Sequence, residues 1–185
     1  VPHITIPLPP VVQKWSPKPF TLADLMDFSK LKKPQLFEDW STQDIHITTA
    51  DGGTGKTTLK LFEAICLALG DRFLGHRCIK PGKTLFITGE DTAEKLGAML
   101  GQICRQMGIM EDATKLNTVL NSIVVKKDTD LCLITKDRLG FLHPNETAFA
   151  HIMEAVHEFK PSMIVFDPIS AFWGSEAALN DMSRT

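Results

Sequence analysis

One nine-residue stretch constrains this chain more than any other feature. Residues 50–58 read Ala-Asp-Gly-Gly-Thr-Gly-Lys-Thr-Thr, which matches the pattern G-x-x-x-x-G-K-[ST] at every fixed position except the first, where Ala50 replaces glycine. An expected strand precedes the stretch and an apolar helical run follows it. In that arrangement, successive backbone N–H groups and a helix N-terminus can surround a phosphate. The stretch therefore predicts a phosphate-binding loop.

The residues of this loop have separate expected roles. Lys56 is expected to reach the β- and γ-phosphates of a nucleotide as a catalytic residue, and Thr57 is expected to coordinate Mg²⁺. The nucleotide-binding residues predicted from the pattern are Asp51, Gly52, Gly53, Thr54, Gly55, Lys56, Thr57 and Thr58. ATP with Mg²⁺ is the ligand that these roles imply. The alternative is a glycine-rich turn that caps a helix and binds nothing.

A second group that could bind the metal is expected at the end of a later strand. Residues 163–167 read Met-Ile-Val-Phe-Asp, four apolar residues followed by an aspartate. This is the form of a Walker B strand, whose aspartate holds Mg²⁺ on the side away from the phosphate loop. Alone, the pattern indicates only a strand end. Behind a phosphate loop, it predicts Asp167 as a metal-binding residue together with Thr57.

Two further acidic residues follow an apolar strand expected over Thr84–Gly89. In a parallel sheet the carboxyl ends of the strands face the ligand crevice, which places Glu90 near the phosphates. A carboxylate there can orient and polarise the attacking water, so Glu90 is the predicted catalytic base. Asp91, with Glu94, is expected to cap the next helix. The alternative is that both acids only cap that helix.

Strands alternate with longer helical stretches along the chain, which predicts an α/β fold with a mainly parallel sheet. Residues 44–49 are expected to form a strand with Ile45 and Ile47 on one face. Residues 111–135 are mixed, with short strands expected in Ser-Ile-Val-Val and Leu-Cys-Leu-Ile-Thr. The other expected elements are a helix over 58–69, a helix that starts at Asp91 and runs to about Met107, a helix over 146–159 with Phe149, Ile152, Met153 and Val156 inward, and a strand over 162–166.

The N-terminal part has a different character. Residues 1–20 contain six of the eleven prolines, which favours an extended or polyproline-II arm. Its apolar side chains predict that it packs on its own domain or on a neighbouring subunit. A short helix is expected over 21–30. The expected domains are a proline-rich arm with this helix over 1–40 and a nucleotide-binding core over 41–185.

Length, charge and cysteine usage exclude several classes. A chain of 185 residues allows one domain with an extension, and the formal net charge of −2 argues against a strongly basic nucleic-acid module. The sequence contains no signal peptide and no long apolar run, so a cytoplasmic protein with no membrane contact is expected. The spacing of the four cysteines fits neither a CxxC pair nor a zinc site, which predicts free buried thiols in a reducing compartment.

Taken together, ADGGTGKTTL, LFITGED and MIVFDPISAF resemble the RecA-type P-loop ATPase core, in the AAA-domain group that includes the RepA-type hexameric replicative helicases of plasmids. The resemblance covers about Asp44 to Gly174. It implies a homo-oligomeric, hexameric ring with nucleotide between subunits, Glu90 as catalytic base and Asp167 on the Mg²⁺ side. It also implies that further strands, a sensor residue and a basic finger lie beyond Thr185, so that the RecA-like core is expected to be C-terminally incomplete.

The leading hypothesis is therefore an ATP-driven ring motor on single-stranded DNA, a helicase or loader in the replication of a plasmid, phage or mobile element. A second hypothesis is a RecA-like ATP switch in recombination or defence that does not unwind DNA. A third, a phosphate-loop kinase of small molecules, is disfavoured because no arginine-rich lid follows the loop and because Gly89-Glu90-Asp91 fits a site that activates water.

Overall fold

The chain forms two compact units, Val1–Lys33 and Pro34–Thr185. A computed structural model describes residues 19, 21–26, 34–42, 44–127, 131–137, 139 and 141–172. In the first unit, α1 spans Leu22–Met26, inside the helix expected over 21–30. The proline-rich arm expected over 1–20 lies outside the described residues apart from residue 19.

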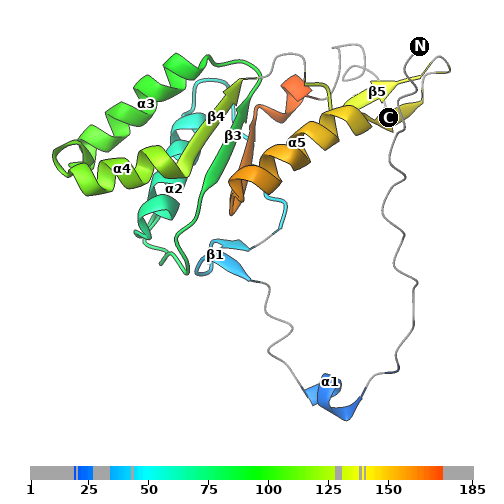
Figure 1. The fold of residues 1–185 in the computed structure, drawn as a ribbon, viewed down its shortest axis with the longest axis horizontal. Helices are drawn as coiled ribbons and strands as arrows, with labels where there is room; N and C mark the ends of the chain where they lie inside the picture. Colours follow the sequence, from blue (N-terminus) through cyan, green and yellow to red (C-terminus); the bar gives the residue numbers. More distant parts are fainter. Residues whose placement is uncertain are drawn as a thin grey trace, which may run out of the picture. The chain divides into compact units, whose positions relative to one another are not determined.

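A three-stranded parallel sheet lies at the centre of the second unit (Figure 1). The strand β3 (Thr84–Thr88) pairs with β4 (Ile123–Lys127) on one side and with β7 (Met163–Asp167) on the other. Both ladders run in register from the first residue of each strand to the last, so the carboxyl ends of all three strands meet at one edge. The predicted α/β fold with a mainly parallel sheet is confirmed.

Helices cover both faces of this sheet. One face carries α2 (Lys56–Leu69), α3 (Ala93–Gln106) and α4 (Ala113–Ser122), and the other carries α5 (Glu146–Phe159) (Figure 1). The described residues also contain two short 3₁₀ turns. Their bounds are η2, Ile109–Glu111, before α4, and η3, Ile169–Phe172, after β7.

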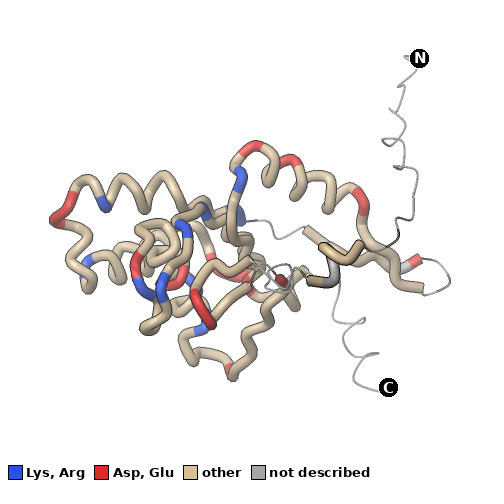
Figure 2. The backbone as a smooth tube through the Cα atoms, turned by 90° about the horizontal axis from the view of Figure 1, so that it is seen from below, with Lys and Arg blue, Asp and Glu red and all other residues tan. Residues whose placement is uncertain are grey.

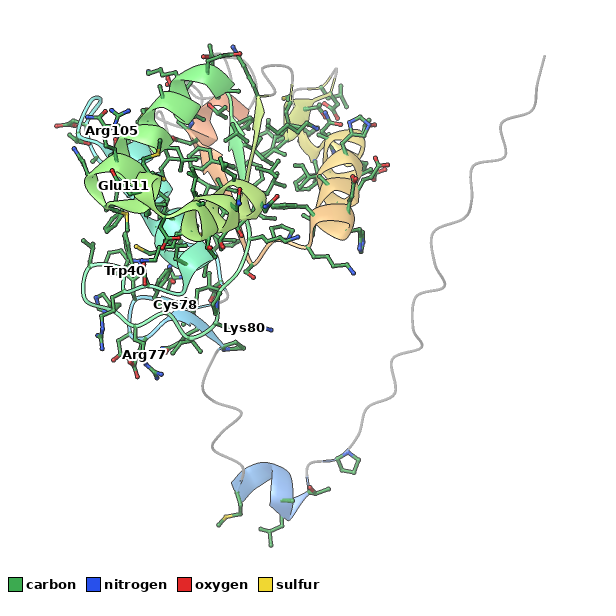
Figure 3. The ribbon with its side chains drawn as sticks, turned by 60° about the vertical axis from the view of Figure 1, so that its left-hand side comes forward. Trp40, Arg77, Cys78, Lys80, Arg105 and Glu111 are labelled. Carbon is green, nitrogen blue, oxygen red and sulfur yellow. The ribbon has the colours of Figure 1, made fainter. Side chains whose placement is uncertain are left out.

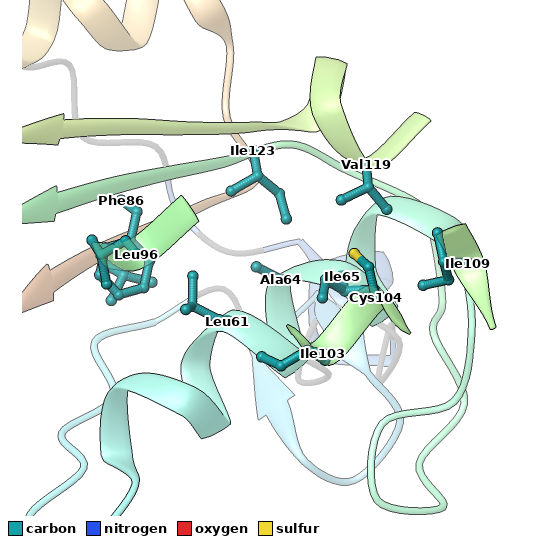
Figure 4. Close-up of a cluster of buried hydrophobic side chains, with 11 residues drawn as sticks. Leu61, Ala64, Ile65, Phe86, Leu96, Ile103, Cys104, Ile109, Val119 and Ile123 are labelled. Carbon is teal, nitrogen blue, oxygen red and sulfur yellow. The ribbon is translucent and has the colours of Figure 1, made fainter. Parts of the chain in front are cut away.

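The side chains of β3 alternate between the two layers. Phe86 belongs to the cluster beneath α2, α3 and α4, whereas Leu85 and Ile87 belong to the cluster beneath α5. A strand buried on both faces needs apolar residues at successive positions, which explains the run Leu-Phe-Ile in this strand. Figure 4 shows the first cluster, in which Leu61 and Ile65 of α2 lie between the sheet and α3.

A small hairpin packs on the C-terminal half of α2. Its strands, β1 (Gln35–Phe37) and β2 (Ser41–Thr42), are antiparallel, and Phe37 forms an isolated bridge with Cys78. These residues share a core cluster with Leu36, Cys66, Leu67 and Phe73. The four cysteines are free; three are buried and Cys132 is half-buried, which confirms the prediction of unpaired thiols.

The strand expected over 44–49 is wrong for this structure. Residues 45–50 have no regular secondary structure, and the side chains of Ile45 and Ile47 are 88% and 79% exposed. Alternation of apolar and polar residues stabilises a strand only when a neighbouring strand supplies hydrogen bonds and an apolar face. Among the described residues, no strand pairs with this segment.

The region between α3 and α5 differs from the expectation in two ways. The helix α4 is absent from the sequence prediction; Asp112 starts it by accepting hydrogen bonds from the backbone N–H groups of Thr114 and Lys115. Val119 is the buried residue of α4. The second difference is a separate antiparallel pair, formed by β5, Ile134–Lys136, and β6, Leu142–Pro144.

The helix expected over 146–159 has the bounds of α5, but its inward face is shifted. Phe149 and Met153 were expected to face inward and are 44% and 49% exposed. Ile152 is buried as expected, Val156 packs against the same cluster, and the other buried position is Ala148. Phe149 and Met153 each lie one residue beyond these buried positions, which turns them about 100° around a helix of 3.6 residues per turn.

Candidate functional site

The phosphate-binding pattern occupies the connection between the exposed segment 45–50 and α2. Gly53 and Gly55 have φ values of +75° and +91°, and Gly55 is the residue that precedes the first turn of α2. These left-handed conformations are readily adopted only by glycine, which explains both glycines in the pattern. Ala50 is not among the described residues with positive φ, so an alanine fits at the first position without backbone strain.

The N-terminus of α2 is open. No side chain caps it, and its first turn contains no acidic residue. A Cβ atom added at Gly52, Gly53 or Gly55 would meet no atom within 4 Å, so the surface of the loop is unobstructed. The first N–H groups of a helix have no partner within the helix, and together with the helix dipole they favour a bound anion. The loop therefore has the form of an anion site.

Lys56 lies folded over this loop. Its Nζ donates hydrogen bonds to the backbone carbonyl oxygens of Ala50, at 2.6 Å, and Asp51, at 2.8 Å. The hydroxyl of Thr54 donates to the same Asp51 carbonyl at 2.8 Å. The ammonium group is thus held at the mouth of the loop by neutral acceptors alone, which leaves its positive charge available to an anionic ligand.

The structure brings Thr57 and Asp167 together. The Thr57 hydroxyl, in the first turn of α2, donates a hydrogen bond to Oδ2 of Asp167 at 2.5 Å. Asp167 is the last residue of β7, and both side chains are partly buried. Two residues 110 positions apart in the chain therefore meet at the carboxyl edge of the sheet.

Glu90 lies at the same edge, in the turn that follows β3. The preceding residue, Gly89, donates its backbone N–H to the carbonyl oxygen of Asp167 at 3.2 Å. A Cβ atom at Gly89 would lie 2.4 Å from the Cβ of Ala171, so only glycine allows η3 to approach this turn. Glu90 itself is exposed, one residue beyond this contact. The predicted base and the predicted metal ligand thus follow adjacent strands.

The expected capping role of Asp91 is wrong. The residue that caps α3 is Thr92, whose side chain accepts a hydrogen bond from the backbone N–H of Lys95. Asp91 is one position too early in the chain to accept this bond. Its carboxylate instead pairs with Lys95 Nζ at 2.5 Å, an interaction that raises the pKa of the lysine.

Two residues near the site were not assigned to it from the sequence. The buried Thr88 hydroxyl donates to the carbonyl oxygen of Asp91 and accepts from its backbone N–H, which fixes the turn that carries Glu90. Lys127 ends β4 directly opposite Thr88. The pKa of Glu94 is lowered by hydrogen bonds from its own backbone and from Thr92, with a smaller contribution from Lys127. The role of Thr88 has a sequence signal, because a threonine at a strand end often bonds to the backbone of the turn that follows.

The donor set fits Mg²⁺ rather than a metal held by protein alone. Within the residues that the structure describes, no three His, Cys, Asp or Glu side chains form a group that could bind a metal ion. Mg²⁺ in phosphate-transfer sites takes one or two protein oxygens and completes its octahedron with phosphate and water. The Thr57 hydroxyl and the Asp167 carboxylate are oxygen donors of this kind.

Comparison with known proteins identifies the family to which the chain belongs. A family model described as an AAA domain matches residues 16–184, which is most of the chain. No curated protein and no solved structure matches significantly. In the part of the chain that is described, no helix is long and apolar enough to cross a membrane. Membership of the family implies nucleotide binding, usually with Mg²⁺. The chain therefore belongs to the AAA domain family of nucleotide-hydrolysing P-loop ATPases.

Proposed function

We propose that this protein binds Mg²⁺-ATP at the loop over 50–58 and hydrolyses it. The observation that carries the proposal is the 2.5 Å contact between Thr57 and Asp167, because it joins the phosphate loop to the end of β7 at one point. In the proposed complex, the backbone of the loop surrounds the phosphates. Lys56 exchanges its two carbonyl acceptors for phosphate oxygens.

Thr57 and Asp167 are the proposed Mg²⁺ ligands. When bound, Mg²⁺ neutralises charge on the terminal phosphates and so assists displacement at phosphorus. Both side chains are presented by rigid elements, the first turn of α2 and the last residue of β7. A site supported in this way keeps its geometry when the nucleotide arrives.

Glu90 is the proposed general base. Its exposed position after β3, one strand from Asp167, supports access to both water and the phosphates. A carboxylate in this place can accept the proton of the attacking water as the bond to the terminal phosphate breaks. The turn that carries it is fixed by Thr88 and by the close approach of η3 to Gly89, so Glu90 is held at a defined place.

At the level of the whole protein, we propose a ring-forming motor that acts on single-stranded DNA, a helicase or loader. The support is the resemblance of the three motifs to RepA-type hexameric helicases. One observation favours the second candidate, an ATP switch without unwinding. Basic and acidic positions are interspersed along the described backbone in Figure 2, in keeping with a net charge of −2, whereas affinity for DNA comes mainly from clustered basic residues.

Steady-state ATP hydrolysis, measured with and without single-stranded DNA, separates these functions. The motor predicts hydrolysis that rises severalfold with DNA, together with displacement of a labelled strand from a forked duplex. The switch predicts hydrolysis without strand displacement. An absence of both nucleotide binding and hydrolysis, with Mg²⁺ present, would rule out the proposed function altogether.

A further inference from the structure

The helix α2 buries a carboxylate that the proposed chemistry does not use. Glu63 is 2% exposed, and both of its oxygens have partners. Oε1 accepts a hydrogen bond from the indole Nε1 of Trp40 at 3.1 Å, and Oε2 pairs with Nζ of Lys60 at 2.7 Å. A buried charge is costly and rarely adds stability beyond what an apolar residue would provide. The burial of Glu63 therefore needs an explanation other than stability.

The first partner belongs to the chain that enters the phosphate loop. Trp40 lies in the turn between β1 and β2, a few residues before the exposed segment 45–50. Its ring packs edge-on against Phe73, with centroids 5.3 Å apart, and lies 5.4 Å from His76. Figure 3 labels Trp40 together with Arg77 and Cys78, which lie on the same side of the molecule. The indole is 41% exposed, yet its N–H points to a fully buried acceptor.

The second partner belongs to the chain that leaves the loop. Lys60 lies four residues after Lys56, which is about one turn further along α2. Its side chain is 20% exposed, so part of its stem is covered. Through Glu63, the residues on either side of the phosphate loop are therefore joined at one carboxylate.

Between these two anchors, the loop over 50–58 is held to the sheet mainly by the contact between Thr57 and Asp167. Ile45 and Ile47 are exposed, and the positions of Gly53 and Gly55 have no neighbouring atoms within 4 Å of an added Cβ. The contacts inside the loop are those of the Lys56 ammonium group and the Thr54 hydroxyl with backbone carbonyls. The geometry of such a loop depends on how its two ends are fixed.

We propose that Glu63 is a positioning residue for the phosphate loop: paired with Lys60 within α2, Glu63 binds Trp40 and so ties the chain that enters the loop to the helix that leaves it. The loop then reaches the nucleotide already arranged, and less ordering is needed on binding. This inference rests on the proposed function of the loop as a nucleotide site.

Trp40→Phe tests the connection while it keeps an aromatic ring against Phe73. The loss of one hydrogen bond to a charged acceptor is expected to weaken Mg²⁺-ATP binding about tenfold, measured by calorimetry. Arg77→Met is the matched control, because Arg77 forms an exposed ion pair with Glu38 of the same hairpin, at 3.3 Å. It is expected to leave the affinity unchanged.

A double variant separates positioning from a stabilising role. Trp40→Phe with Glu63→Leu replaces the hydrogen-bonded pair by apolar side chains, which is often nearly neutral for stability, and Lys60, at 20% exposure, can turn its ammonium group to water. Its melting temperature is expected to return to within a few degrees of the wild type. For a domain of this size, a few degrees correspond to a change of about 1 kcal/mol in the free energy of unfolding. Its nucleotide affinity is expected to remain about tenfold weaker, since the connection is still missing. Recovery of both properties would overturn the proposal.

A readout without nucleotide keeps this test independent of the proposed function. In limited digestion with trypsin, cleavage after Lys56 is expected to be severalfold faster in Trp40→Phe than in the wild type, while cleavage after Arg105 in α3 stays unchanged. Unchanged cleavage after Lys56, or equal acceleration at both sites, overturns the positioning role. A wild type that binds no nucleotide instead overturns the proposed function, whatever the digestion shows.

Discussion

The acidic residues and the phosphate loop reach the same edge of the sheet but are held there by different means. Asp167 and the turn that carries Glu90 follow β7 and β3, two strands paired in full register, with β3 buried along its whole length. The chain that enters the loop, residues 45–50, is unpaired and exposes Ile45 and Ile47. The core fixes the carboxylates, whereas a few side-chain contacts fix the loop.

This contrast indicates how the two regions respond to change. Regions with few buried contacts open locally at low free-energy cost, while paired core strands open only with the whole domain. Substitutions at the loop should therefore alter ligand binding with little effect on global unfolding. Substitutions in the strands should alter global unfolding first.

Lys56→Ala is expected to have the largest effect on the loop. It removes the charge that neutralises the β- and γ-phosphates, so hydrolysis should fall by about 10³-fold or to below detection. The melting temperature should change little, because Lys56 contacts only loop carbonyls. Lys80→Ala, at an exposed position outside the loop, is the control for removal of a lysine. Normal turnover in Lys56→Ala would remove the phosphate loop from the account.

Glu90→Gln should separate binding from chemistry. We expect the affinity for Mg²⁺-ATP to be retained and kcat to fall by about 10²–10⁴-fold, the usual contribution of a positioned general base. Asp91→Asn is the matched comparison, since Asp91 pairs with Lys95. A larger loss of kcat in Asp91→Asn than in Glu90→Gln would mean that the two acids have been assigned the wrong roles.

A pair of isoleucine substitutions tests the contrast between strand and loop directly. Ile87→Ala, at a position 1% exposed in β3, should lower the free energy of unfolding by about 2–5 kcal/mol. Ile47→Ala, at a position 79% exposed, should change it by no more than about 0.5 kcal/mol. Chemical denaturation measures both. Similar losses would show that residues 45–50 are packed in solution.

The smallest expected effect is at Cys66, on the packed side of α2. Burial raises the pKa of this thiol to about 12 from its ordinary value of 9.0, so at pH 8 it remains protonated. The stability that this shift contributes is complete below pH 9.0 and is lost as the pH rises through about 12. Iodoacetamide at pH 8 should therefore leave Cys66 unlabelled while the half-buried Cys132 reacts, as followed by peptide mass spectrometry. Early labelling of Cys66 would mean that α2 opens away from its core.

The fold and the site could be predicted from the sequence where a local pattern of residues determines the local structure. The glycine-rich loop before α2, the apolar strand β3 and the aspartate that ends β7 each follow from residues at fixed positions. The roles expected for Thr57 and Asp167 around one Mg²⁺ also required the two residues to lie close together, and they do.

Prediction failed where a residue's state depends on its neighbours in space. Ile45 and Ile47 alternate like strand residues, but a strand also needs a pairing partner. Asp91 and Thr92 are both able to cap a helix, and the geometry of the turn at Thr88 decides in favour of Thr92. No sequence signal pairs Glu63 with Trp40, which lies 23 positions earlier.

The most direct test of the central claim is the Mg²⁺ dependence of ATP affinity in the wild type and in Asp167→Asn. If Thr57 and Asp167 form one Mg²⁺ site, the wild type should bind ATP at least about tenfold more tightly with Mg²⁺ than with a chelator. In Asp167→Asn most of that gain should disappear, in line with the roughly 10–100-fold effects of residues that tune a metal site. The same gain in both proteins, or no gain in the wild type, would contradict the account.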